Sequence, residues 1–361
     1  MKRIVIIGLG LIGGSIAKSL RKVYPDCNIV AVNRSIGSCD SALSEKVINE
    51  AYSELSGECL GSMENSDVIF LCTELNSSKE IIDILIKRFN NKKTIITDVC
   101  STKEEIKNIF QNTKYNINYI GGHPMAGSEK SGYKFSSGYL LENAIYILCP
   151  VENTNEADID FMKNIISDIG ALPYIMEAKT HDEAMAQISH MPHITAAALV
   201  NAAGSYGNRE ILNNLAAGGF KDITRIASGD PDLWKNISIS NRKNIINSID
   251  NLIGNLNEFK IALEKSDKEQ LNLLFSSARN NREAYETGRK TIMNLMYELN
   301  IDVPDRPGII SEITLKLTQN NINIKNIYIA ESRENELGCL RLAFDSKEAR
   351  DKAAEILNSS Y

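Results

Sequence analysis

The chain has 361 residues, of which 43% are hydrophobic and 24% charged, and its formal net charge is −6. This length suggests two or three domains of roughly 100–200 residues each, and the hydrophobic content is sufficient for ordinary buried cores. Because the net charge is negative and no basic stripe dominates, a nucleic-acid partner is not expected.

The cysteines and the N-terminal residues bear on compartment and on metal binding. The seven cysteines are scattered without a Cys-x-x-Cys pair, which favours reduced thiols in a cytoplasmic protein over disulfides or a zinc site. An apolar run follows Lys2 and Arg3 as in a signal peptide, but glycines interrupt it. No segment approaches the ~18 uninterrupted apolar residues of a membrane span. We therefore expect neither a bound metal nor a membrane partner.

Residues 1–176 are expected to form a doubly wound α/β domain. Short apolar runs alternate there with amphipathic stretches, as strands separated by helices do. Continuous apolar runs are typical of a parallel sheet that helices cover on both faces. The runs expected as strands are residues 3–8, 28–33, 67–72, 94–99, 118–122, 143–150 and 172–176.

Residues 177–291 are expected to form a second, all-helical domain. Helical patterns follow one another from residue 178, and residues 233–265 carry apolar side chains at intervals of three and four, as one amphipathic helix would. The apolar surplus of this region favours a homodimer interface.

Residues 292–361 change pattern again. Strand patterns at 292–304, 322–332 and 337–344 alternate with helical patterns at 305–321 and 346–358. This order, βαββα, predicts a small α+β domain of the ferredoxin-like kind.

Three glycines near the N-terminus have the spacing of a phosphate-binding turn. Gly8, Gly10 and Gly13 form Gly-x-Gly-x-x-Gly directly after a strand pattern and at the start of a helix pattern. Such glycines allow a tight turn, close approach of a pyrophosphate, and packing of the helix on the strand. With Leu11 and Ile12 between them, they predict a dinucleotide site at the helix N-terminus.

The choice of dinucleotide is open from these residues alone. The acid that binds an NAD ribose is expected ~20 residues after the glycines, but that place holds Asn33, followed by Arg34. Asn33 can bind ribose hydroxyls without repelling a 2′-phosphate, and Arg34 could pair with one. NADP therefore stays open beside NAD.

The sequence contains only four histidines, at 123, 181, 190 and 193. His123 follows a predicted strand within the glycine-rich stretch 121–132, so it should lie at the carboxyl edge of the sheet, where such folds bind ligands. Ser101 follows the preceding strand and could orient it. His190 and His193 share a helical face, whereas His181 and His190 could equally be core histidines.

Residues 218–234 add a cationic pair. Lys221 and Arg225 are four apart and so share a helical face. Arginine is suited to hold a carboxylate through two parallel hydrogen bonds, although both could also be solvated charges.

Five blocks together resemble the prephenate and arogenate dehydrogenases of tyrosine biosynthesis. They are GLGLIGGS (8–15), DVCSTK (98–103), GGHPMAGSEKSG (121–132), SHMPHITAAAL (189–199) and GGFKDITRIASGDPDLW (218–234). The resemblance covers about residues 1–290, and the tail with DRPG (305–308) resembles an ACT domain, a module that usually binds amino acids as a regulator.

The resemblance implies NAD-dependent oxidative decarboxylation of prephenate to 4-hydroxyphenylpyruvate. His123 matches the catalytic histidine, Ser101 the serine that orients it, and Arg225 the arginine that holds a substrate carboxylate. The residues that match the substrate pocket are His193, Lys221, Trp234 and, at its mouth, Glu129. The tail implies tyrosine as an effector, with Asp305, Pro307, Gly308 and Asn326 as its expected contacts.

Other interpretations remain at this stage. Arogenate could replace prephenate as the substrate, and a related β-hydroxyacid dehydrogenase would need Lys221 in the catalytic role. A non-enzymatic sensor of dinucleotide and amino acid would not need Ser101, His123 and Arg225 together. The tail shows βαββα, whereas ACT domains are usually βαββαβ, which leaves effector binding open.

Overall fold

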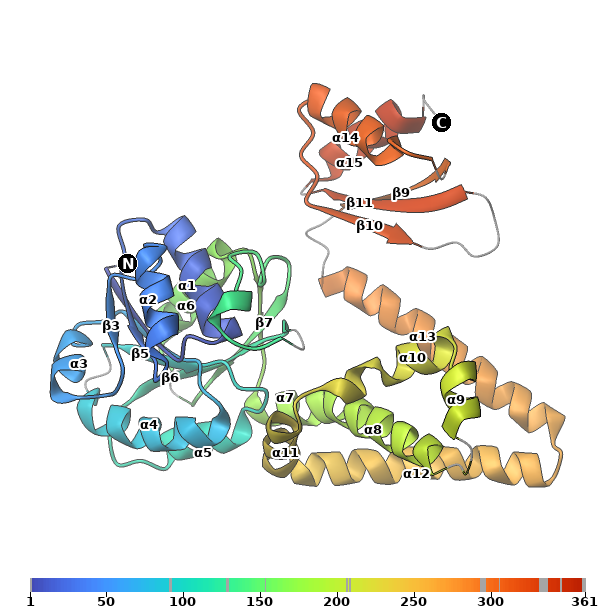
Figure 1. The fold of residues 1–361 in the computed structure, drawn as a ribbon, viewed down its shortest axis with the longest axis horizontal. Helices are drawn as coiled ribbons and strands as arrows, with labels where there is room; N and C mark the ends of the chain where they lie inside the picture. The colour runs from blue at the N-terminus through green and yellow to red at the C-terminus, as the bar shows by residue number, and fades with distance from the viewer. Residues whose placement is uncertain are drawn as a thin grey trace. The chain divides into compact units, whose positions relative to one another are not determined.

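The computed structural model describes residues 2–90, 93–127, 130–152, 154–205, 207, 209–292, 297–304, 306–330, 337–344 and 346–358 (Figure 1). The chain divides into two compact units, Met1–Gly254 and Asn255–Tyr361, and each is described by itself. The expected Glu129 and Asp305 lie outside the described residues.

The first unit contains an eight-stranded sheet in the order β3-β2-β1-β4-β5-β6-β7-β8. Neighbouring strands are parallel except for β6 and β7, which run antiparallel. The strands are β1 (Arg3–Ile7), β2 (Asn28–Val32), β3 (Glu50–Tyr52), β4 (Val68–Leu71), β5 (Ile95–Asp98), β6 (Asn118–Pro124), β7 (Ile145–Pro150) and β8 (Leu172–Ile175). The short strand β3 was not predicted.

Helices cover both faces of this sheet, as expected of a Rossmann-type fold. The helices are α1 (Leu11–Val23), α2 (Ile36–Ser44), α3 (Gly57–Ser62), α4 (Leu75–Arg88), α5 (Glu104–Gln111) and α6 (Glu156–Asp168). Alternate residues of β1 point to opposite faces: Ile4 and Ile6 pack with α1, α2 and α6, whereas Val5 and Ile7 pack with α3, α4 and α5.

The sheet is parallel as predicted except at one pair, β6 and β7, which is antiparallel. A parallel return needs a crossover along a face of the sheet, usually through a helix. Among residues 125–144, those that the structure describes contain only the 3₁₀ turn η1 (Tyr133–Phe135) and no longer helix. This segment contacts α1, where the Ser137 amide donates to Ser15 Oγ (3.0 Å) and Ser19 Oγ donates to the Gly138 carbonyl (3.0 Å). The chain therefore re-enters the sheet antiparallel.

The region after β8 is helical, as predicted. Its elements are α7 (Ala178–Met185), the π-helical turn η2 (Ala186–His190), α8 (Met191–Gly204), α9 (Arg209–Leu215), α10 (Gly218–Thr224), the 3₁₀ turn η3 (Arg225–Ser228), α11 (Pro231–Ser240), α12 (Arg242–Glu264) and α13 (Lys268–Ile292). Pro192 lacks an N–H, and its ring clashes with the carbonyl four residues back, which accounts for a widened turn just before it.

The single helix expected over residues 233–265 is two helices. Asn241 lies between α11 and α12 with φ −106° and ψ 25°. Its buried side chain donates to the carbonyl of Asp182 at 2.7 Å. This tertiary contact breaks a helix whose apolar period continues on both sides.

The second unit contains the predicted βαββα domain. Its elements are β9 (Tyr297–Pro304), α14 (Ile309–Gln319), β10 (Asn326–Ala330), β11 (Leu337–Phe344) and α15 (Lys347–Asn358). The strands form an antiparallel sheet in the order β10-β11-β9. Ile313 and Leu317 of α14 pack with Leu342 and Phe344 of β11 in its core.

Candidate active site

The glycine turn between β1 and α1 is shaped by close packing on two sides and is open on a third. Gly8 has φ +101°, and a Cβ there would lie 2.6 Å from the Cys72 carbonyl oxygen; a Cβ on Gly13 would lie 2.0 Å from the Gly8 oxygen. A Cβ on Gly10 would meet nothing within 4 Å. Helix α1 begins beside this open face with no acidic residue in its first turn, so the turn fits a pyrophosphate.

Asn33 connects the end of β2 to this turn. Its Oδ1 accepts a hydrogen bond from the Leu9 amide (3.0 Å), and its Nδ2 donates to the Ser35 carbonyl (3.1 Å). A neutral amide thus occupies the place where an acid would repel a 2′-phosphate. Arg34, next to it, is exposed.

Asp98 organises the point where β5 and β6 separate. These strands pair only at Ile95–Asn118 and Ile96–Tyr119. Beyond that, the buried carboxylate of Asp98 accepts from the Tyr119 hydroxyl (2.7 Å) and the Gly122 amide (3.2 Å), and it forms an ion pair with the buried Lys103. A Cβ on Gly122 would lie 2.4 Å from the Asp98 carbonyl oxygen. These contacts fix the backbone directly before His123.

His123 lies near the carboxyl end of β6, partly buried. Its Nδ1 is 2.8 Å from Nε2 of His181, and Nδ1 of His181 is 2.7 Å from Oδ1 of Asp182. Asp182 also accepts from the backbone amides of Lys103 (2.8 Å) and Glu104 (2.9 Å), at the start of α5. Through His181 and Asp182, helix α7 thus connects the imidazole of His123 to the N-terminus of α5.

The surroundings of His123 favour its neutral form. Burial, and then the nearby His181, Lys103 and His190, hold the pKa of His123 well below its usual value. A neutral imidazole at the ligand-binding edge of the sheet can accept a proton at neutral pH.

The histidines of the π-helical turn and α8 contact Trp234 of α11. The rings of His193 and Trp234 stack with centroids 3.4 Å apart, and His190 meets Trp234 edge to face at 6.3 Å. His190 Nδ1 lies 3.2 Å from the side-chain amide of Asn241, and burial lowers the pKa of His190 to about 4. The expected pocket residues His193 and Trp234 therefore lie together.

The remaining expected site residues that the structure describes are Lys221, Arg225 and Ser101. Lys221 lies on α10 and Arg225 opens η3; both are exposed, and α10 and η3 pack against α8. Ser101 is partly buried, and its hydrogen bond to His123 is not found among the described residues, where His181 occupies Nδ1 instead. Three residues that contact the site were not singled out as site residues from the sequence: Asp98, His181 and Asp182. The signal available for Asp98 was a charged residue in an otherwise apolar strand pattern, residues 94–99.

Three of the expected effector residues are described by the structure: Pro307, Gly308 and Asn326, in the second unit. Gly308 caps α14 with φ +88°, and Pro307 precedes it. Asn326 begins β10 and donates from Nδ2 to the Tyr328 hydroxyl at 2.7 Å.

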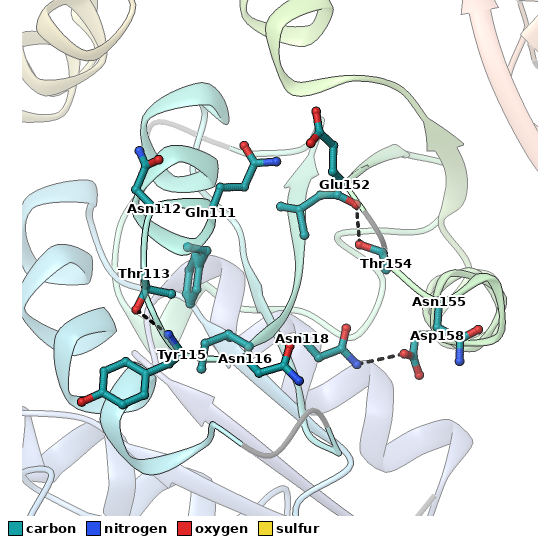
Figure 2. Close-up of a pocket in the computed structure, with 13 residues that line it drawn as sticks. Gln111, Asn112, Thr113, Tyr115, Asn116, Asn118, Glu152, Thr154, Asn155 and Asp158 are labelled. Carbon is teal, nitrogen blue, oxygen red and sulfur yellow. Dashed lines mark hydrogen bonds between the residues drawn. The ribbon is translucent and has the colours of Figure 1, made fainter.

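A polar cavity of about 670 Å³ lies elsewhere, at the C-terminal end of α5 (Figure 2). Asn118, at the start of β6, lines it and donates to Asp158 at 3.0 Å. His123 is five residues further along the strand, ~16 Å away at the usual rise, so the cavity is not part of this site. The described residues contain no group of three or more His, Cys, Asp or Glu side chains able to hold a metal ion.

The fold, the glycine turn and the partly buried imidazole of His123 together define a dinucleotide-dependent dehydrogenase with a helical second domain. Residues 16–174 match the nucleotide-binding domain of prephenate dehydrogenase, residues 177–277 its dimerisation domain, and residues 297–355 an ACT domain. The chain belongs to the prephenate dehydrogenase family, as its sequence blocks predicted.

Individual relatives agree with this assignment. A prephenate dehydrogenase of Bacillus subtilis is 35% identical over 99% of this chain and 95% of its own length. A solved prephenate dehydrogenase from A. aeolicus, in complex with hydroxyphenyl propionate and NAD+, is 29% identical with a TM-score of 0.71 over 79% of this chain and 98% of its own. Synechocystis arogenate dehydrogenase is 28% identical, with a TM-score of 0.67 over 78% and 99%.

Proposed function

We propose that the protein catalyses the NAD-dependent oxidative decarboxylation of prephenate to 4-hydroxyphenylpyruvate, a step of tyrosine biosynthesis. The observation that carries this proposal is the neutral imidazole of His123 at the carboxyl edge of the sheet, held by His181 on the same side of the fold as the glycine turn. An alcohol oxidation needs such a base beside the dinucleotide.

The residues of this chain would divide the work as follows. His123 accepts the proton of the ring hydroxyl, and Ser101 orients the hydroxyl and the imidazole. Arg225 binds a substrate carboxylate through its guanidinium, while His193, Lys221 and Trp234 line the pocket and Glu129 stands at its mouth. A bound nicotinamide would supply the acceptor for the hydride of the hydroxyl-bearing carbon. Loss of CO2 then aromatises the ring.

The glycine turn would hold the pyrophosphate through Gly8, Gly10, Leu11, Ile12 and Gly13, with the ribose near Asn33 and Arg34. NAD is the proposed cofactor, supported by the NAD+ complex of the A. aeolicus relative. Asn33 and Arg34 would also admit NADP, because neither repels a 2′-phosphate.

Arogenate is a second candidate substrate, favoured by the similarity to Synechocystis arogenate dehydrogenase. It differs from prephenate in carrying an amino group where prephenate carries a keto group. The pocket lined by His193, Lys221 and Trp234 would have to make this distinction.

For assembly and regulation we propose a homodimer formed through residues 177–291, next to a nucleotide-binding domain of 1–176 and a regulatory domain of 292–361. The match to a dimerisation domain and to an ACT domain supports self-association and binding of a small molecule. Tyrosine is the proposed effector, with Asp305, Pro307, Gly308 and Asn326 as its contacts. In the part of the chain that the structure describes, no helix has the length and apolar character needed to cross a membrane.

The test is to mix the full chain with prephenate or arogenate and NAD or NADP, and to follow reduced nicotinamide and released CO2. We expect one reduced nicotinamide per CO2 with prephenate and NAD, and inhibition on adding tyrosine. Turnover with arogenate alone would favour the second candidate, and no reduction with either substrate would refute the proposed activity.

A further inference from the structure

Asp182 is the fixed end of the polar chain that reaches His123. The carboxylate is buried and accepts the amides of Lys103 and Glu104 at 2.8 and 2.9 Å. These amides open α5, and the N-terminus of a helix favours a negative charge. An ionised carboxylate can only accept hydrogen bonds, so the third contact, His181 Nδ1 at 2.7 Å, must be a donor.

The direction of the His181–Asp182 hydrogen bond fixes the direction of the hydrogen bond between His123 and His181. A neutral imidazole that donates from Nδ1 carries its lone pair on Nε2. His181 Nε2 therefore accepts, and its partner at 2.8 Å, Nδ1 of His123, must carry the proton. With a neutral His181, both bonds therefore run in one direction, from His123 through His181 to Asp182.

We infer that His181 and Asp182 are positioning residues that fix the tautomer of His123, with the proton on Nδ1 and the lone pair on Nε2 facing away from α7. This inference rests on the proposed function, in which Nε2 receives the hydroxyl proton of the substrate. The imidazolium so formed keeps its Nδ1–H bond to His181, which in turn stays bonded to Asp182. The arrangement resembles in its logic a carboxylate that holds a catalytic histidine, with a second imidazole placed between them.

The direct test is the tautomer of His123 in the full chain labelled with ¹⁵N-histidine. Only four histidines occur, so four ring systems are observed, and single His→Gln variants assign them. Two-bond ¹H–¹⁵N spectra at neutral pH should show His123 protonated on Nδ1. Protonation on Nε2 in the unaltered chain would overturn the inference, and this measurement needs no substrate.

Two variants of His181 separate positioning from packing. In His181→Leu the acceptor is lost, so His123 should populate both tautomers, and kcat should fall on the order of 10²-fold, within what a general base contributes, with KM nearly unchanged. In His181→Gln, Oε1 stands near the former Nε2, so the Nδ1–H tautomer and most of kcat should return. Met185→Leu, a conservative change of a buried residue one turn along α7, is the matched control.

The positioning role of His181 and the proposed reaction can be refuted separately. His181→Leu with an unaltered tautomer and unaltered kcat overturns the positioning role while prephenate turnover stands. A chain that shows the Nδ1–H tautomer but reduces no NAD with prephenate or arogenate supports the positioning role and refutes the proposed reaction.

Discussion

The imidazole of His193 stacks on the indole of Trp234, with centroids 3.4 Å apart and planes 16° from parallel. Gly229 lies against this pair: a Cβ there would be 2.6 Å from Trp234 Nε1 and 2.9 Å from His193 Cε1. The stack joins α8 to α11 and needs a residue without a side chain at its edge.

Gly229→Ala should therefore displace one of the rings. Overpacking of this kind costs about 1–3 kcal/mol, so the Tm in a calorimetric melt should fall and KM for the substrate should rise. Gly254→Ala is the control, because a Cβ there meets nothing within 4 Å and alanine favours a helix over glycine. An unchanged Tm and KM in Gly229→Ala would show that the stack adapts freely.

Gly10 and Gly13 should respond differently to alanine. A Cβ on Gly10 meets no protein atom within 4 Å, whereas one on Gly13 would lie 2.0 Å from the Gly8 oxygen. Gly10→Ala should keep the wild-type Tm but weaken NAD binding at least about tenfold, or ~1.4 kcal/mol, by calorimetric titration. Gly13→Ala should lower the Tm as well. Wild-type NAD affinity in Gly10→Ala would contradict the placement of the pyrophosphate.

The buried ion pair of Asp98 and Lys103 should be costly to break. Lys103→Met leaves the carboxylate buried without its cation, a change that costs about 3–5 kcal/mol in other proteins, so the Tm should fall strongly. Lys235→Met is the control, since Lys235 pairs with Asp232 on the surface at 2.6 Å and exposed pairs contribute little. Equal effects of the two substitutions would contradict a structural role for Lys103.

Stability should fall as the pH is lowered from 7 towards 5. The pKa values of His123 and His190 are lowered in the folded chain, to about 4 for His190, against about 6.5 when unfolded. Below pH 6.5 the unfolded chain therefore binds more protons than the folded one, at a cost of up to ~1.4 kcal/mol per pH unit for each histidine.

Thermal melts between pH 7 and 5 measure how stability depends on pH. His190→Gln should reduce this dependence, because one of the histidines with a lowered pKa is removed. A Tm that stays constant or rises on acidification over this range would contradict the neutral state of both histidines.

Asn33 should set the tolerance for NADP. Asn33→Asp keeps an oxygen to accept from the Leu9 amide but adds a charge that repels a 2′-phosphate. We expect kcat/KM with NADP to fall at least about tenfold relative to NAD, or ~1.4 kcal/mol. If the ratio of kcat/KM with NADP to kcat/KM with NAD were the same in Asn33→Asp as in the wild type, the 2′-hydroxyl of the ribose would lie away from Asn33.

Local patterns in the sequence predicted the helices and strands around the site, but not the contacts that these elements make with one another. The glycine spacing and the apolar runs gave the position of His123 at the end of β6, because these depend on neighbours in the chain. The antiparallel direction of β7 depends on hydrogen bonds between α1 and residues 137 and 138, which no periodicity encodes.

The same limit applies to His181. Its sequence context fits a core histidine, and it is indeed buried, but its ring also contacts His123, 58 positions away. The break at Asn241 likewise depends on a bond to Asp182 and not on the helical period, which continues through it.

The central claim is that His123 is the base that receives the hydroxyl proton. The most direct measurement compares wild type and His123→Asn in prephenate-dependent reduction of NAD, with substrate binding followed by equilibrium titration. We predict that kcat falls by at least about 10²-fold, within the contribution of a general base, while the Kd for prephenate changes little. Turnover at the wild-type rate in His123→Asn would contradict the claim.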